Sequence, residues 1–325
     1  MFTRTRRLRN SKNLREIVRD VRLNISELIY PLFVVEGKDR KEEIPSMPNQ
    51  YRFSIDRLDE ELKELSELKI KSLLLFGIPD HKDEIGSEGF SPNGIVQQAV
   101  RFIKSNYPEF IVITDVCMCE YTSHGHCGIL KGHDVDNDET LKYLQKIALS
   151  HAQAGADIVA PSDMMDGRIK ALREILDENG FINTPVMAYS VKYSSNYYGP
   201  FRDAADSCPS FGDRKTYQMD FRSSKEFYRK VESDIKEGAD FIMVKPALAY
   251  LDVIQAVRDI NLPLVAYNVS GEYSMVKAAA LNGWIDERGI VMENMMALKR
   301  AGVNLIITYH AKDIAIWAKN NEVEL

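Results

Sequence analysis

Eight short apolar segments recur along the chain, and turn or helix signals separate each one from the next. Most are apolar along their whole length instead of alternating with polar residues, which is typical of parallel strands buried on both faces. The eight segments are residues 28–35, 71–78, 110–116, 157–161, 185–191, 240–244, 263–269 and 304–309.

Helical patterns fill the intervals between these segments. In "SPNGIVQQAVRFIK" we expect Ser91 to be the N-cap and Pro92 to be the first helical residue. Three similar junctions, "AGADIVAPSD", "EGADFIMVKP" and "AGVNLIITYH", place Gly155, Gly238 and Gly302 where a left-handed residue would end a helix before a strand.

Eightfold strand–helix alternation predicts an α/β protein with a (β/α)8 TIM barrel. A doubly wound open sheet is the alternative, but no glycine-rich dinucleotide loop follows the first strand. We expect an extended N-terminal arm (residues 1–25) followed by one catalytic barrel domain (residues 26–325).

Composition limits the class of protein. The chain has 325 residues, 45% of them hydrophobic, and a net charge of −6. It lacks a run of about 18 apolar residues that would cross a membrane, and its N-terminus lacks the apolar core of a secretory signal. The sequence therefore predicts a cytoplasmic protein without a membrane partner.

The first 22 residues are rich in arginine although the chain as a whole is acidic. A tail that binds nucleic acid, or a targeting segment, is one interpretation. Glu16 and Asp20 interrupt the basic run, however, and Leu14 and Val18 favour a short amphipathic helix. We favour an arm that packs on an acidic neighbouring subunit, with no nucleic-acid partner.

Polar residues gather where the predicted strands end. Because the active site of such a barrel lies at the carboxyl ends of its strands, we expect these side chains to meet at one mouth. They are Asp115, Cys117, Cys119, Ser162, Asp163, Lys192, Lys245, Ser270 and Tyr309.

Two lysines end adjacent strands. Burial of an amine lowers its pKa, and a neutral amine can attack a ketone or aldehyde to form a Schiff base. A lysine that extends to solvent or binds phosphate is the alternative for either residue alone. With two such lysines, Lys192 and Lys245, we expect each to lower the pKa of the other.

Three cysteines, Cys117, Cys119 and Cys127, fall within eleven positions. Three thiolates suit one soft divalent ion, above all Zn²⁺, and leave a fourth position open, as in catalytic zinc sites. A strained disulfide or unreactive thiols are the alternatives. His124 and His126 could be further ligands or partners of the ligands, and Cys208 is expected to be unligated.

A long segment without an apolar pattern, residues 193–222, follows the fifth strand. Loops of this length in barrels are often active-site lids. Two of its arginines, Arg202 and Arg214, suit bidentate binding of a carboxylate, although solvated charges would have the same appearance in a sequence.

Longer motifs resemble one known family. The stretches "TDVCMCEYTSHGHCG", "APSDMMDGR", "YSVKYSSNYYGPFRDAA", "GDRKTYQMD", "EGADFIMVKPALAYLD" and "NVSGEY" are similar to those of porphobilinogen synthases, also called 5-aminolevulinate dehydratases. The resemblance covers nearly the whole chain. It implies a hydro-lyase that condenses two 5-aminolevulinate molecules into porphobilinogen with loss of two waters, in tetrapyrrole (haem) biosynthesis.

The resemblance also implies individual roles. Lys245 would form a Schiff base with the substrate that enters first, whose carboxylate Ser270 and Tyr309 would hold. Lys192 would bind the second substrate. The other residues implied in substrate binding or proton transfer are Arg202, Arg214, Gln218, Tyr198, Phe201, Asp115, Ser162 and Asp163, and the three cysteines match the zinc-dependent branch.

Family resemblance further implies a homo-octamer whose N-terminal arms contact neighbouring barrels. Many bacterial members carry a glutamate that takes part in an allosteric magnesium site, and Lys230 stands at that position here. We therefore do not expect allosteric Mg²⁺.

Two other functions fit part of the pattern. A Schiff-base aldolase would need one lysine and a phosphate site, but it would not need three thiolates. A non-catalytic zinc sensor on the same barrel would keep the cysteines and could lose either lysine.

Overall fold

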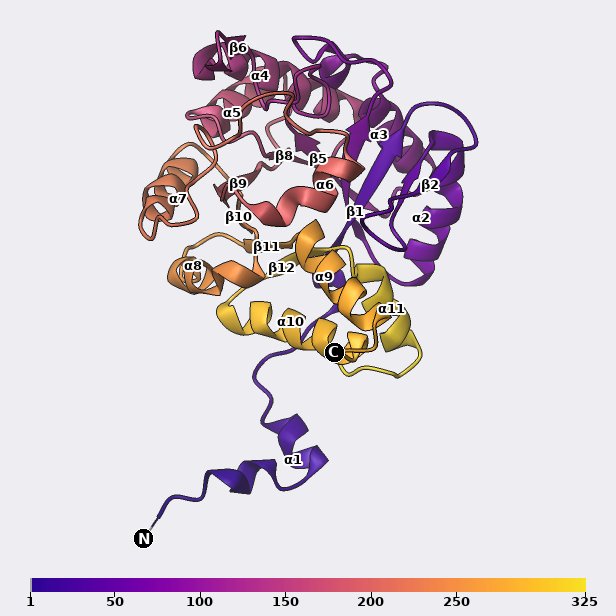
Figure 1. The fold of residues 1–325 in the computed structure, drawn as a ribbon, viewed down its shortest axis with the longest axis vertical. Helices are drawn as coiled ribbons and strands as arrows, with labels where there is room; N and C mark the ends of the chain where they lie inside the picture. Colours follow the sequence, from indigo (N-terminus) through magenta and orange to yellow (C-terminus); the bar gives the residue numbers. More distant parts are fainter. Residues whose placement is uncertain (1) are drawn as a thin grey trace.

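Eight parallel strands form a ring enclosed by helices in the computed structural model, which describes residues 2–325 (Figure 1). The strands of the ring are β1 (Leu28–Val35), β4 (Ser72–Ile78), β5 (Ile111–Val116), β8 (Ile158–Pro161), β9 (Met187–Lys192), β10 (Phe241–Lys245), β11 (Leu264–Asn268) and β12 (Leu305–Thr308). Their hydrogen-bonded order is β8-β5-β4-β1-β12-β11-β10-β9.

The ring closes between its first and last strands. Val159 of β8 bridges to Val186, next to β9, and its amide donates to the carbonyl of Pro185 at 3.1 Å. The predicted (β/α)8 barrel is confirmed, and the open-sheet alternative is excluded. Each of the eight predicted segments overlaps one strand, and the predicted ends differ from the observed ends by two residues at most.

The remaining elements surround or cap the ring. Four short strands lie outside it: β2 (Lys41–Glu43), β3 (Tyr51–Phe53), β6 (Leu130–Lys131) and β7 (Asp134–Val135). The helices are α1 (Lys12–Ile17), α2 (Leu58–Glu67), α3 (Ile95–Asn106), α4 (Asn137–Ala154), α5 (Arg168–Glu178), α6 (Gly199–Ala204), α7 (Glu226–Lys236), α8 (Leu251–Val257), α9 (Ser270–Leu281), α10 (Glu287–Ala301) and α11 (Ala311–Lys319).

Helix ends follow the sequence signals in part. Gly155 and Gly302 end α4 and α10 with φ of 106° and 116°, and Gly238 has φ of 102°, so all three left-handed positions are confirmed. The predicted start of α3 is wrong. Gly94, not Ser91, precedes α3, because the Gly94 amide donates to the Ser91 carbonyl and closes a separate turn first.

Two apolar clusters divide the strand residues by alternation. Ile113, Ala160, Met243 and Ile307 belong to the cluster that also contains the buried aromatic residues of the barrel mouth. Apolar neighbours in sequence, such as Val112, Val159, Val244 and Ile306, belong to the larger cluster that includes the apolar faces of the helices. Strand periodicity therefore decides which residue at each strand end faces inward.

One irregularity changes this alternation in β9. Ala188 pairs with Ile242 and Val191 pairs with Val244, so three steps along β9 match two along β10. The extra residue is a β-bulge. As a result, Tyr189 and Lys192 share the inner face although they are three residues apart.

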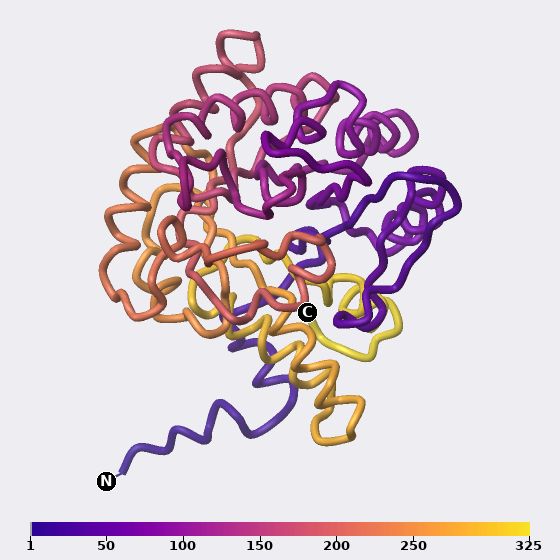
Figure 2. Tube along the Cα trace, turned by 45° about the horizontal axis from the view of Figure 1, so that its top comes forward, coloured from indigo at the N-terminus to yellow at the C-terminus, as the bar shows by residue number. Residues whose placement is uncertain are grey.

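The N-terminal segment extends away from the barrel in both views (Figures 1 and 2). It exposes the apolar side chains of Phe2, Leu8, Ile17 and Val18. Arg19 contacts Glu324, near the C-terminus, at 2.6 Å. Within residues 2–325, every helix is too short or too polar to cross a bilayer.

Candidate active site

Two lysines lie side by side at the barrel mouth. Lys192 of β9 and Lys245 of β10 are Cα partners in the parallel ladder. Their Nζ atoms lie 5.6 and 5.2 Å from the centroid of the same ring, that of Tyr189. Three further rings surround Lys245 Nζ at 4.2 to 5.3 Å, those of Tyr267, Phe201 and Tyr198.

The two amines differ in pKa. Burial and, next, the positive charge of Lys192 lower the pKa of Lys245 to about 7. Burial also disfavours the charge on Lys192, but the negative charges of the three cysteines outweigh it and raise the pKa of Lys192. Lys192 thus lowers the pKa of Lys245 as expected, whereas the net shift of the Lys192 pKa is upward. Its ammonium donates to the Ser162 carbonyl at 2.5 Å.

Two acids lie beside these amines. Asp115 Oδ2 accepts a hydrogen bond from Ser162 Oγ at 2.9 Å, and burial and, next, the charge of Glu120 raise the pKa of Asp115 to about 7. Asp163 follows Ser162 and, by alternation, faces the other way. It accepts from the Met165 amide at 2.7 Å and lies 3.5 Å from the buried guanidinium of Arg168.

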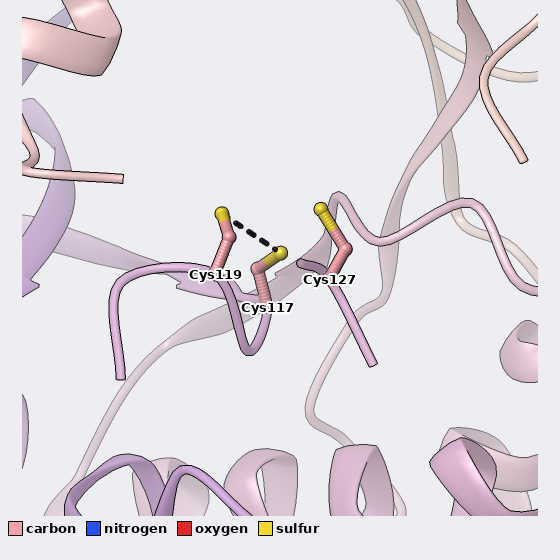
Figure 3. Close-up of side chains that lie close together, drawn as sticks. All are labelled: Cys117, Cys119 and Cys127. Carbon is pink, nitrogen blue, oxygen red and sulfur yellow. Dashed lines mark hydrogen bonds between the residues drawn. The ribbon is translucent and has the colours of Figure 1, made fainter. Parts of the chain in front are cut away.

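The three clustered cysteines bring their sulfurs together (Figure 3). Cys117 Sγ and Cys119 Sγ are 3.4 Å apart, all three sulfurs lie within 4.8 Å of one another, and all three side chains are buried. Each is a free thiol, so the disulfide alternative is excluded in this structure. Three convergent soft donors fit a zinc-like ion.

The other residues near this cluster have different partners. His124 and His126 do not join the sulfur cluster, and Cys208 is exposed and lies outside it. His126 contacts the hydroxyl of Tyr217 and the carbonyl of Phe211.

Residues 193–222 cover the mouth. The segment is not irregular throughout, because it contains a short 3-10 turn, Asn196–Tyr198, and then α6, which lies across the centre of the ring in Figure 1. Tyr198, Phe201, Arg202 and Arg214 line one pocket with both lysines.

Three expected substrate-binding residues remain. Ser270 Oγ accepts from the Phe201 amide at 2.9 Å, so α9 supports α6. The hydroxyl of Tyr309 lies 3.0 Å from that of Tyr267 inside the barrel. Gln218 is buried one turn after Arg214, and its side-chain oxygen and nitrogen have no hydrogen-bond partner within residues 2–325. A bound polar ligand would satisfy these atoms.

Sequence reasoning missed four site residues. Glu120 lines the pocket with its Oε2 3.2 Å from Cys119 Sγ, and its place directly after a candidate ligand was an available signal. Tyr189 and Tyr267 stand at inward positions of strands whose ends were singled out. Tyr217, in the lid, packs against the three cysteines, and no signal in the sequence indicates this contact.

A barrel with a buried amine of lowered pKa and a three-thiol cluster at its mouth has the features of an enzyme that acts on carbonyl compounds. The family model for delta-aminolevulinic acid dehydratase matches residues 2–317. The chain belongs to this family, whose members are lyases, and the enzyme class expected from the sequence is confirmed.

Relatives match over nearly their full length. The delta-aminolevulinic acid dehydratase of Bacillus subtilis is 56% identical over 317 residues, which cover 97% of this chain and 98% of that protein. The enzyme of Staphylococcus epidermidis is 56% identical over 316 residues, with coverage of 96% and 98%.

A solved structure has the same fold. The Toxoplasma gondii enzyme, crystallised with its reaction product porphobilinogen, superposes with a TM-score of 0.96 at 44% identity. The match covers 98% of this chain and 92% of that one.

Proposed function

We propose that this chain condenses two 5-aminolevulinate molecules into porphobilinogen and two waters, through imines on Lys245 and Lys192. The observation that carries the proposal is the pair of buried amines over one ring, of which one has a pKa of about 7. Two amines correspond to two keto acids, whereas a Schiff-base aldolase would use one.

Lys245 takes the first substrate in this proposal. Its amine is neutral in a large fraction of molecules near pH 7, so its nitrogen can attack the ketone, and water leaves as the imine forms. The surrounding aromatic rings exclude the water that would reverse this step. Ser270 and Tyr309 hold the carboxylate of this molecule.

The second substrate lies against Lys192, with its carboxylate near Arg202, Arg214 and Gln218. Both guanidinium groups belong to the lid and line the pocket with the lysines. A planar guanidinium can bind a carboxylate through two parallel hydrogen bonds. Tyr198 and Phe201 pack over the bound molecules.

Proton transfer is assigned to Asp115, hydrogen-bonded to Ser162. A carboxyl group with a pKa of about 7 can both accept and donate a proton at neutral pH. Asp163 has a structural role in this proposal, because its carboxylate pairs with the guanidinium of Arg168 and does not line the pocket.

Cys117, Cys119 and Cys127 hold a Zn²⁺ ion in this proposal. Such an ion, when bound, polarises a carbonyl or a leaving hydroxyl as a Lewis acid. The three buried sulfurs are the supporting observation. No allosteric Mg²⁺ is included, because the ammonium of Lys230 already pairs with Asp234 at 2.8 Å.

The proposal includes a cytoplasmic homo-oligomer, an octamer by family resemblance, in which residues 1–25 contact a neighbouring barrel. Exposed Phe2, Leu8 and Ile17 support such a contact, because a lone chain would leave them in water. Removal of residues 2–22 should lower the assembly mass measured by light scattering, and an unchanged mass would contradict this part.

Borohydride reduction with 5-aminolevulinate, followed by peptide mapping, tests the central claim. We expect an adduct on Lys245 at low substrate and on Lys192 as well at saturation. An adduct on Lys245 alone at every concentration would favour a one-lysine enzyme. Labelling of neither lysine would refute the proposal.

A further inference from the structure

The lid is bonded to the loop that carries the cysteines. We call residues 117–127 the metal loop and residues 193–222 the lid segment. The Ser210 amide and hydroxyl donate to the His124 carbonyl at 3.0 and 3.2 Å, and Arg214 Nη2 donates to the Gly125 carbonyl at 2.9 Å. These bonds join lid groups to the backbone of the metal loop, within the three residues before Cys127.

Gly125 allows this close approach. It has φ of +70°, and a Cβ atom there would lie 2.5 Å from the carbonyl oxygen of Cys208 in the lid. The two backbones therefore touch at a position that only glycine fits without strain.

Tyr217 extends the connection to a candidate metal ligand. The Phe211 carbonyl can only accept, so His126 Nε2 donates to it (3.0 Å), and in the neutral imidazole His126 Nδ1 is then an acceptor. The Tyr217 hydroxyl donates to that Nδ1 at 3.1 Å and accepts from the Cys127 amide at 3.5 Å. This chain of bonds alternates between metal loop and lid and has one consistent direction.

Each bond holds one loop in place with respect to the other. An ion held by three sulfurs would fix the metal loop, including the backbone of Cys127, and so preserve the surface on which the lid is docked. Conversely, the Tyr217 hydroxyl positions the Cys127 backbone. Coupling between metal binding and lid closure is reciprocal, because one coupling free energy describes the effect of each event on the other.

We infer that metal binding and lid closure are coupled in this protein through Tyr217, a positioning residue for Cys127. The inference rests on the proposed metal site. It assigns to the metal loop a second task besides holding the ion, which is to keep Arg214 of the lid at the mouth.

Tyr217→Phe removes the hydroxyl and keeps the ring. We expect the Kd for Zn²⁺, measured on the full chain by competition with a chromophoric chelator, to rise about tenfold. Thr216→Val is the matched control, because it also deletes one lid hydroxyl, but that hydroxyl bonds to Asp134 of β7 and not to the metal loop. Its Kd should equal that of the unaltered protein.

Limited trypsin digestion without substrate gives the reciprocal measurement. Lys215 and Arg222 are exposed cleavage positions in the lid. Chelator-treated protein should be cut there about ten times faster than Zn²⁺-loaded protein, since cleavage follows the population of the open lid. The difference should shrink in Tyr217→Phe and persist in Thr216→Val.

The outcomes separate the two proposals. If the unaltered chain binds no Zn²⁺, the proposed metal site fails, and the coupling fails with it. If Zn²⁺ binds but the lid is cut at the same rate with and without it, the coupling is overturned and the metal site stands. The digestion of the unaltered protein needs no variant, so a poorly folded Tyr217→Phe would not leave the inference untested.

Discussion

Lys192 and Lys245 are Cα partners on neighbouring strands, and their amine nitrogens lie over the same Tyr189 ring at 5.6 and 5.2 Å. Burial and, next, the positive charge of Lys192 lower the pKa of Lys245. Burial also acts downward on Lys192, but negative charge in the cysteine cluster, above all at Cys127, outweighs it and raises the pKa of Lys192. In the proposed mechanism Lys245 would act as the neutral nucleophile, and Lys192 would remain a cation until substrate binds.

Replacement of Lys192 tests whether its charge sets the difference in pKa between the two lysines. In Lys192→Met the charge that lowers the pKa of Lys245 is absent, so that pKa should rise above about 7. The neutral amine would then need a higher pH. We expect the pH midpoint for borohydride trapping at Lys245 to move upward by about one unit. An unchanged midpoint would mean that burial alone sets the pKa.

Asp115→Asn should have the opposite effect. The carboxylate of Asp115 raises the pKa of Lys245, so its loss should lower that pKa and allow trapping at a lower pH. The same peptide-mapped trapping assay measures the shift. A midpoint that moves upward, as in Lys192→Met, would show that Asp115 does not act on Lys245 as a negative charge.

Much of the fold follows from the sequence because buried parallel strands are apolar along their length. The alternation of β8 continues just beyond its end, so that Ser162 lines the pocket and Asp163 does not. The β9 bulge breaks that rule, so the shared face of Tyr189 and Lys192 could not be derived from a period of two.

The lid segment is the part of the site that the sequence predicts least well. Its arginines were recognisable by charge, but the contact of Tyr217 with the cysteines depends on how an aperiodic segment folds back. The expected cap at Ser91 failed for a similar reason, because a local turn competed with the helix start. Patterns of hydrophobicity carry no information about such contacts.

The metal loop gives a direct test with an internal control. Cys119→Ala should abolish stoichiometric Zn²⁺ binding and turnover, since two thiolates remain where three are needed. Cys208→Ser should retain both, because Cys208 is exposed and outside the cluster. Metal content by mass spectrometry and thermal unfolding should be measured together. Full activity of Cys119→Ala in the presence of a chelator would refute a catalytic role for the metal.

Arg168 is predicted to be a structural requirement of the barrel. It is fully buried between two buried acids, 3.5 Å from Asp163 and 3.6 Å from Asp234, and it donates to the Tyr189 carbonyl at 3.0 Å. Arg168→Met would leave both carboxylates without the guanidinium, and breaking a buried pair in this way costs about 3 kcal/mol or more.

Urea unfolding measures the cost of this change, with Arg222→Met as the control. Arg222 is exposed, so its loss should change the free energy of unfolding by no more than about 0.5 kcal/mol. Lys230 also pairs with Asp234, at 2.8 Å, and can compensate for part of the lost charge. If Arg168→Met were as stable as the control, the remaining cation would suffice, and the Arg168 network would not stabilise the barrel.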